Sequence, residues 1–254
     1  MTTMTRSITT DVPGPARAQA PDFPLYAGDP VRLSGRGWAV LMAAVVVGAA
    51  CDLLVGVPGP AWLALVVRGV LFAGIPLLTL HLLAPGTIGR LFQRLRPRAA
   101  LLAVGIAVAN VVVTFAVGAL VSMLVGTTTN PMAGTIADQG ALDKVLTFLA
   151  MIPQLVGEEI FTVLPLLAVL TLATRVLHLS RRTGLVLAVT VAAVLFSALH
   201  LPTYGWNVLQ CLAVIGIARV ILLVPYLVTK NLTASATAHV LNDWALFGFT
   251  AIAG

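Results

Sequence analysis

In the second half of the chain, residues 144–173 read KVLTFLAMIPQLVGEEIFTVLPLLAVLTLA. A helix of about 20 residues crosses the hydrocarbon core of a bilayer, and this apolar run is longer than that. It carries Glu158 and Glu159 side by side near its centre. We therefore expect a membrane-spanning helix with a polar centre. Pro153 leaves two options open, a short interfacial helix followed by a crossing or one long helix.

The whole chain has the composition of a membrane protein. Of its 254 residues, 59% are hydrophobic and 9% are charged, against about 25% charged residues in a soluble domain. So few polar residues cannot cover a water-exposed surface, which argues against a soluble enzyme and a disordered chain. The net charge of +6 does not indicate a nucleic-acid partner. The basic residues lie between apolar runs, where they meet lipid headgroups, so we expect no nucleic-acid partner.

The succession of apolar runs predicts an all-α fold, a polytopic transmembrane helical bundle of about seven spans. The predicted spans are 38–57, 61–83, 99–125, 144–173, 184–201, 207–228 and 232–252. Residues 1–37 are polar and lack the apolar segment of a signal peptide, so we expect a disordered cytoplasmic tail. Residues 38–143 would then form three N-terminal transmembrane helices, and residues 144–254 a core that carries the candidate catalytic motifs.

Basic residues mark one side of the predicted bundle. They lie in the tail and in every second connection: Arg6, Arg17, Arg32, Arg36, Arg90, Arg94, Arg96, Arg98, Arg175, Arg181, Arg182 and Lys230. Basic loops stay on the cytoplasmic side, so we expect the N-terminus inside and the C-terminus outside. The Ala-, Val- and Arg-rich composition favours the plasma membrane of a bacterium. Cys51 and Cys211 each lie in an apolar run and are expected to be unpaired.

Ionisable side chains inside the predicted spans indicate a candidate site. A charged group there costs about 2.5–3.5 kcal/mol on insertion scales, so each one needs a role. Glu158 and Glu159 are the only glutamates in the chain. Consecutive helical residues point about 100° apart, so the two carboxyl groups cannot share one role. Taken alone, the pair would equally fit an ion pair with Arg68 or Arg219.

Two further spans carry polar groups at helical spacing. Phe196 and His200 are four residues apart, as are His239 and Asp243, and Asn242 lies on nearly the same face as the second pair. Each pair alone would fit a simple structural contact. Acids and histidines on three separate apolar helices, however, can be buried only against one another or around a water-filled cavity. Because His200 lies near the outer end of its predicted span and His239 near the inner end, the helices must be tilted or shifted to meet.

These motifs, in this order, resemble those of the CPBP family of intramembrane proteases, which includes the type II CAAX prenyl endopeptidases and bacterial abortive-infection and bacteriocin-processing proteins. The resemblance covers about residues 145–252. It implies an endopeptidase in the lipid bilayer that hydrolyses a peptide bond in a membrane-embedded or membrane-associated peptide substrate. The family's first motif ends in Arg, but Val163 occupies that position here. Glu159 then needs another cation, from Arg219 or Arg68, and Val163→Arg is expected to raise activity or stability.

The resemblance also implies roles for the site residues. The catalytic set comprises Glu158, Glu159, His200, His239 and Asp243. Hydrolysis needs an activated water and stabilisation of the oxyanion, so Glu158 would act as general base with His200, and His239 would polarise the substrate carbonyl. Asp243 would orient His239. The supporting residues are Phe196, Asn242 and Arg219.

The sequence leaves two possibilities for the cofactor, namely none or zinc. Glu158, His200 and His239 would supply a zinc site with an open fourth position. The same residues permit a metal-free glutamate mechanism, which we favour, with the two histidines further apart than a shared ion allows. Two rival functions remain: a catalytically impaired homologue that acts as a membrane scaffold or immunity factor, and a proton-coupled transporter that uses the buried groups as a relay.

Overall fold

The structure of the protein is a computed structural model that describes residues 22–26 and 28–253, with only the backbone from residue 250 onward. The described residues form helices and connections, without a strand. The elements are α1 (Gly35–Leu54), α2 (Ala61–Leu83), α3 (Thr87–Leu91), α4 (Pro97–Val125), α5 (Pro131–Ala137), α6 (Ala141–Arg175), α7 (Arg181–Leu199), α8 (Val208–Gln210), the π-helical turn η1 (Cys211–Ile215), α9 (Gly216–Leu222), α10 (Val224–Thr229) and α11 (Leu232–Ala253).

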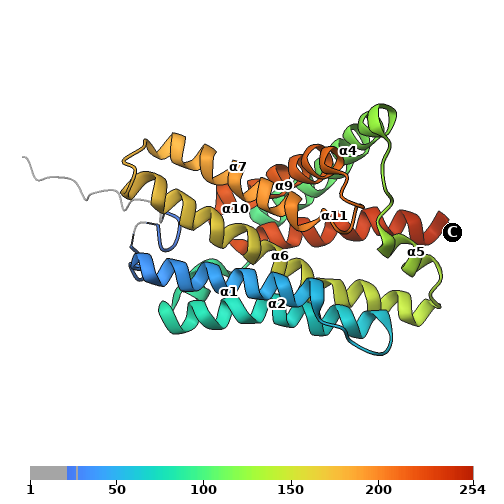
Figure 1. The fold of residues 1–254 in the computed structure, drawn as a ribbon, viewed down its shortest axis with the longest axis horizontal. Helices are drawn as coiled ribbons and strands as arrows, with labels where there is room; N and C mark the ends of the chain where they lie inside the picture. Colours follow the sequence, from blue (N-terminus) through green and yellow to red (C-terminus); the bar gives the residue numbers. More distant parts are fainter. Residues whose placement is uncertain (1–21, 27, 254) are drawn as a thin grey trace, which may run out of the picture.

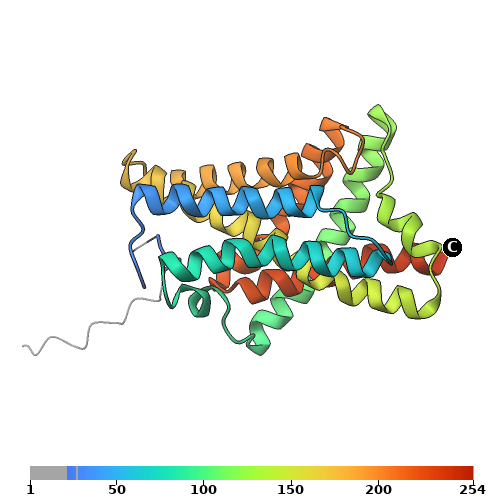
Figure 2. The same cartoon turned by 60° about the horizontal axis from the view of Figure 1, so that its bottom comes forward.

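The described segments include six that are long and apolar enough to span a membrane: α1, α2, α4, α6, α7 and the run Val208–Thr229 made by α8, η1, α9 and α10. Helix α11 adds 22 residues, which corresponds to a length of about 33 Å. The long helices lie side by side, and α4 crosses the others obliquely (Figures 1 and 2). The predicted all-α bundle of about seven spans is confirmed.

Helix α6 runs through the centre of this bundle as one continuous helix. Its 35 residues include Pro153 and Pro165, and they extend over about 52 Å. Pro153 therefore lies inside a long helix and does not separate an interfacial helix from a crossing. A proline removes one backbone donor, which membrane helices tolerate when neighbouring helices pack closely around the site.

Glycines bring α1, α2 and α6 into close contact. A Cβ atom on Gly69 of α2 would lie 2.5 Å from the backbone N of Gln154 in α6. A Cβ atom on Gly157 of α6 would lie 2.7 Å from a ring carbon of Phe72 in α2. Small residues at helix contacts allow such approach in membranes. Their chain neighbours Arg68 and Glu158 consequently line the same cavity.

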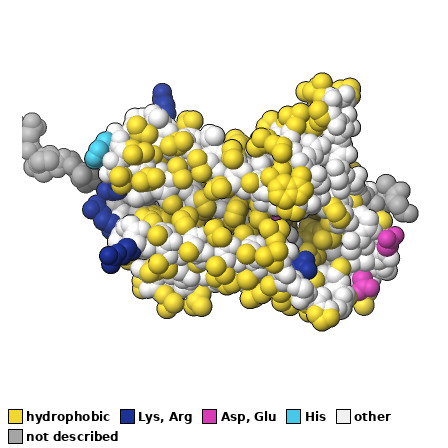
Figure 3. Space-filling view, viewed as in Figure 1, with side chains coloured by type: hydrophobic (Ala, Val, Ile, Leu, Met, Phe, Trp, Pro, Cys, Tyr) yellow, Lys and Arg dark blue, Asp and Glu magenta, His cyan; other side chains and the backbone are white. Residues whose placement is uncertain are grey.

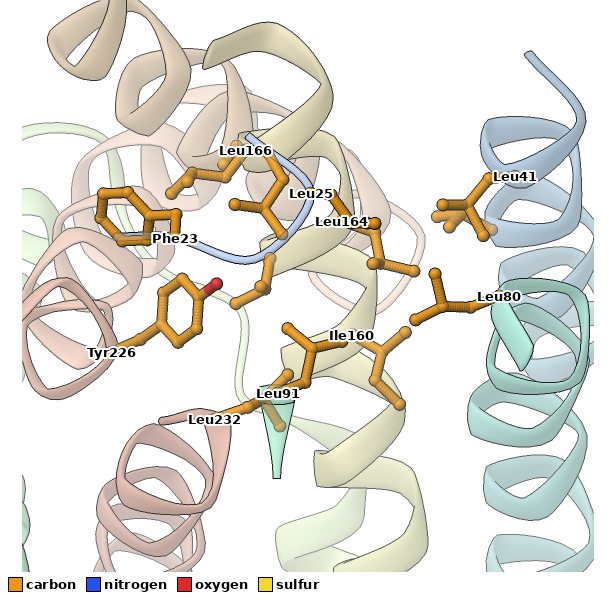
Figure 4. Packing of buried hydrophobic residues seen from close by; sticks show 14 of the residues in the cluster. Phe23, Leu25, Leu41, Leu80, Leu91, Ile160, Leu164, Leu166, Tyr226 and Leu232 are labelled. Carbon is orange, nitrogen blue, oxygen red and sulfur yellow. The ribbon is translucent and has the colours of Figure 1, made fainter. Parts of the chain in front are cut away.

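The segment before α1 packs on the bundle. Phe23 is 1% exposed, and its ring centroid lies 5.7 Å from that of Tyr226 in α10 (Figure 4). Arg181 at the start of α7 pairs with Asp22 at 2.7 Å. Partial burial opposes ionisation of Asp22, but its hydrogen bonds with Arg181 and the Phe23 backbone hold the pKa of its carboxyl group below the ordinary value. In the described part of the predicted tail, residues 22–26 and 28–37, Asp22 and Phe23 are therefore packed on the bundle rather than disordered. The prediction for residues 1–21 lies outside the described residues.

The charges of the protein separate along its long axis. Lys and Arg gather mainly at one end of the visible face, acidic side chains appear at the other, and hydrophobic side chains cover the length between them (Figure 3). The basic end holds the start of α1, the end of α6 and the start of α7 (Figure 1). This distribution is typical of a membrane protein. The inside location of the basic end stays a prediction.

Candidate active site

The centre of α6 positions the two glutamates in different surroundings. Glu158 is 6% exposed and lines a cavity. Glu159 is fully buried, and its carboxylate accepts a hydrogen bond from Nη2 of Arg219 in α9. The two adjacent carboxyl groups therefore face different surroundings, in agreement with the expectation that they cannot share one role. One glutamate faces the cavity and the other faces a buried cation.

Arg219 supplies the cation that the missing motif arginine would have provided. Its side chain is fully buried, and its Cζ atom lies 4.8 Å from the ring centroid of Phe196. Val163 is also fully buried, within the main hydrophobic cluster. Arg68, the other candidate, instead donates from Nε to the backbone carbonyl of Val55 at 2.7 Å and lines the cavity. The cation for Glu159 thus comes from a different helix.

His239 of α11 lies between the two glutamates. Its Nδ1 atom is 3.0 Å from Oε1 of Glu159, and its Nε2 atom is 3.6 Å from Oε2 of Glu158. An ionised carboxylate only accepts hydrogen bonds, so Nδ1 carries the hydrogen and the ring orientation is fixed. Asp243 lies 3.7 Å from Nε2, which is too long for a hydrogen bond. Glu159, and not Asp243 as expected from the sequence, therefore orients this imidazole.

His200 follows the last residue of α7 and is oriented by its own helix. Its Nδ1 atom lies 2.9 Å from the backbone carbonyl of Phe196. A carbonyl can only accept, so Nδ1–H donates and Nε2 keeps its lone pair when the ring is neutral. The Phe196 ring lies 4.5 Å from the His200 ring and 6.1 Å from the His239 ring, measured between centroids. Phe196 consequently packs against both histidines and Arg219.

The lengths and starting points of the helices explain how these groups meet. Helix α7 runs antiparallel to the second half of α6 (Figure 1), and its 19 residues reach about 28 Å from the basic end. The distance from Arg175 back to Glu158 along α6 is similar. Helix α11 begins inside the bundle, because Leu232 is fully buried in the cluster that contains Leu91 and Ile160 (Figure 4). Helices α7 and α11 are thus shifted relative to each other along the bundle, which is the kind of shift expected from the sequence.

A cavity of about 350 Å³ adjoins these residues. Its lining combines apolar side chains with ionisable and amide groups: Arg68, Asn130, Pro131, Met132, Met151, Gln154, Leu155, Glu158, His200, Thr203, Asp243 and Phe247. Water occupies buried cavities that are polar and roomy enough to offer it several partners. The cavity therefore has the size and chemistry to hold water next to a carboxylate and an imidazole.

Two asparagines connect Asp243 to α4. Asn242 donates to Oδ1 of Asp243 at 2.9 Å, and Asn110 donates to Oδ1 of Asn242 at 2.9 Å. Asn110 is fully buried. Sequence reasoning missed this contribution from the N-terminal spans, although an amide inside the apolar run 99–125 was a visible signal. It also missed Gln154, which lines the cavity.

The arrangement does not fit the zinc site that Glu158, His200 and His239 would supply. Within the described ranges, no group of three or more His, Cys, Asp or Glu side chains is placed to hold a metal ion. The described carboxylates and imidazoles therefore do not form the predicted zinc site.

The fold and the site together define a class of protein, the helical multi-pass membrane proteins in which ionisable groups from several spans meet at a cavity. Comparison with protein families narrows this class. Residues 141–245 match the family described as type II CAAX prenyl endopeptidase Rce1-like. This match covers the part of the chain that carries the motifs, and it confirms the resemblance to the CPBP/CAAX family of intramembrane proteases stated from them. Searches of curated proteins and of solved structures found no match.

Proposed function

We propose that the protein is an intramembrane endopeptidase that hydrolyses a peptide bond of a membrane-embedded substrate at the cavity beside Glu158. One observation carries this proposal: Glu158, His200 and Asp243 line the same cavity, and the oriented imidazole of His239 lies 3.6 Å from Glu158. The family assignment supports a peptidase. The plasma membrane of a bacterium stays the predicted location.

The first step is the activation of water. A water molecule in the cavity donates one hydrogen bond to the Glu158 carboxylate and another to Nε2 of His200. Glu158 takes the proton as the water oxygen attacks the scissile carbonyl carbon and a C–O bond forms. The neutral tautomer of His200 suits this role, because its Nδ1–H is already engaged by the Phe196 carbonyl and its Nε2 can only accept.

The second step is the stabilisation and collapse of the tetrahedral intermediate. With both ring nitrogens protonated, His239 donates from Nε2 to the oxyanion while Nδ1–H stays bound to Glu159. The C–N bond then breaks, and Glu158 returns its proton to the departing amine. The acid and the new amino terminus leave the cavity, and Glu158 is again a carboxylate. Atoms and charge balance without a metal or a further reactant.

The test is Glu158→Gln, assayed with the purified protein in lipid vesicles that contain a library of quenched fluorescent, membrane-anchored peptides. The amide keeps the shape of the side chain but cannot take the proton of water. We expect turnover to fall at least about 100-fold, the lower range of general acid–base contributions, with unchanged thermal unfolding. Asp143→Asn is the matched control, because Asp143 is an exposed acid at the start of the same helix. Equal turnover in Glu158→Gln and wild type would refute the role of Glu158.

One sequence feature favoured an impaired homologue, namely Val163 at the motif arginine position. The Arg219–Glu159 pair weakens that argument, since Glu159 has a fully buried cation partner. An impaired homologue predicts no turnover of any peptide in the wild type. A proton-coupled transporter predicts uptake of a solute into vesicles that depends on a proton gradient. Measurements of peptide turnover and of solute uptake in the same vesicles distinguish these two functions from the peptidase.

A further inference from the structure

A second and larger hollow lies between the segment before α1, α1, α6 and α7. It has a volume of about 650 Å³, within the range of about 300–1,000 Å³ that is typical of small-ligand pockets. We call it the α1–α6 groove. Apolar side chains form most of its wall, including Trp38 and Met42 from α1 and Phe161 and Val169 from α6. The residues that line it differ from those that line the catalytic cavity.

Two guanidinium groups also line the α1–α6 groove. Arg32 precedes α1 and Arg175 ends α6, so both belong to the basic end of the bundle. Arg32 is exposed and has no hydrogen bond or ion pair with a described residue. Arg175 uses Nε to donate to the backbone carbonyl of Tyr26 at 2.9 Å, which leaves its two terminal nitrogens for another acceptor. The groove thus joins an apolar wall to a pair of cations.

The nearby acids do not neutralise these cations. Asp22 pairs with Arg181, and Asp29 lies 3.6 Å from Arg90. Guanidinium groups bind phosphate with paired hydrogen bonds. A ligand that complements this groove therefore has an anionic phosphate at one end and an apolar chain at the other.

We propose that the α1–α6 groove binds one anionic phospholipid, with its phosphate at Arg32 and Arg175 and an acyl chain along Trp38, Met42 and Phe161. Basic pockets between transmembrane helices at the cytoplasmic side are a recurrent form of lipid-headgroup site. The apolar wall reaches along the membrane-spanning part of α1 and α6, where an acyl chain would lie. The site is separate from the catalytic cavity, so it does not rest on the proposed peptidase function.

The test measures binding of phosphatidylglycerol and phosphatidylcholine with matched acyl chains to the purified full-length protein in detergent micelles. Native mass spectrometry counts retained lipid, and the shift of thermal unfolding with lipid concentration gives an affinity. The Arg32→Gln/Arg175→Gln variant should bind phosphatidylglycerol at least ten-fold more weakly. The control, Arg94→Gln/Arg98→Gln, removes the same charge from exposed arginines that do not line the groove and should change affinity less than two-fold.

A third variant makes the test independent of the arginines. Ala168 lines the apolar wall, so Ala168→Phe narrows the groove, keeps both cations and should also reduce phosphatidylglycerol retention at least ten-fold. Equal retention of both lipids by the wild type, or equal loss in the control pair, would overturn the proposal. It would also be overturned if Ala168→Phe bound lipid normally, or if the groove variants changed the KM for peptides and left lipid binding intact. Because the two sites are separate, the Glu158→Gln variant should bind phosphatidylglycerol as the wild type does, and a loss of binding in this variant would contradict the proposal.

Discussion

The Nδ1 atom of His239 lies 3.0 Å from Oε1 of Glu159, and both side chains are buried. The same carboxylate oxygen binds Arg219. This contact connects the second glutamate of the motif to the histidine of the last helix. It fixes the ring so that Nε2 faces Glu158 and Asp243. We therefore propose that Glu159 acts as a positioning residue for His239.

The buried Glu159–Arg219 pair should be sensitive to the loss of either partner. Glu159→Gln or Arg219→Gln leaves an uncompensated buried charge, so each is expected to lower the free energy of unfolding by about 3–5 kcal/mol. Thermal or denaturant unfolding in detergent measures this. The double variant removes both charges and should be less destabilised than the sum of the single variants.

The partly exposed pair of Asp22 and Arg181 provides the control, since pairs near the surface contribute about 0–1 kcal/mol. If Arg219→Gln unfolded at the same temperature as Arg181→Gln, the importance of the buried pair would be contradicted.

Asn110 should affect catalysis through Asn242 and Asp243. Asn110→Leu leaves Oδ1 of Asn242 without its donor, which we expect to destabilise the protein by about 1–3 kcal/mol. It should also lower kcat more than it changes KM, because Asp243 loses its support beside the cavity. Thr114→Val is the matched control, since the Thr114 hydroxyl is buried one turn further along α4 without a hydrogen-bond partner among the described residues. A similar kcat in both variants would show that Asn110 is only structural.

The contact between α2 and α6 at Gly69 should not tolerate a methyl group. In Gly69→Ala the new Cβ would lie 2.5 Å from the Gln154 backbone, so the helices must separate, at a cost of about 1–3 kcal/mol. Since Arg68 and Glu158 flank this contact, turnover should fall as well. Gly74→Ala in the same helix meets nothing within 4 Å and should be neutral or slightly stabilising. Equal unfolding temperatures for the two variants would contradict the close packing.

Val163→Arg is now expected to destabilise the protein, which reverses the expectation from the sequence. Val163 is fully buried among apolar side chains, and Glu159 already has Arg219 as its partner. A second guanidinium would be buried without a free counter-charge, at a cost of several kcal/mol. Unfolding in detergent measures the effect, and Val163→Ala, which only removes methyl groups, should cost less. A rise in unfolding temperature or turnover in Val163→Arg would restore the original expectation.

Turnover should persist after removal of metal ions. The described part of the site has no group of side chains placed to share an ion, and the proposed steps need only Glu158, His200 and His239. Activity and metal content are measured in the same purified sample before and after a strong chelator. Stoichiometric zinc that is lost together with activity, and restored with it, would show that the mechanism uses the metal.

The class of the fold and the candidate site residues could be predicted from the amino-acid sequence. Apolar runs of spanning length can be satisfied only as helices in a bilayer, because lipid offers no hydrogen bonds to the backbone. For the same reason, the acids and histidines in those runs had to meet one another. Glu158, Glu159, His200 and His239 were identified on this ground, and α6, α7 and α11 bring them together.

The pairing of the polar groups depends on how the helices pack against one another, which the sequence does not show. A sequence gives the face of a helix on which a side chain lies, but not the rotation and depth of the neighbouring helices. The close contacts at Gly69 and Gly157 set the distance between α2 and α6, and the buried start of α11 sets the depth of His239. These contacts give Glu159 its cation from Arg219, assign the orientation of His239 to Glu159, and place Asn110 behind Asp243. Each depends on packing between residues far apart in the chain, which local periodicity does not encode.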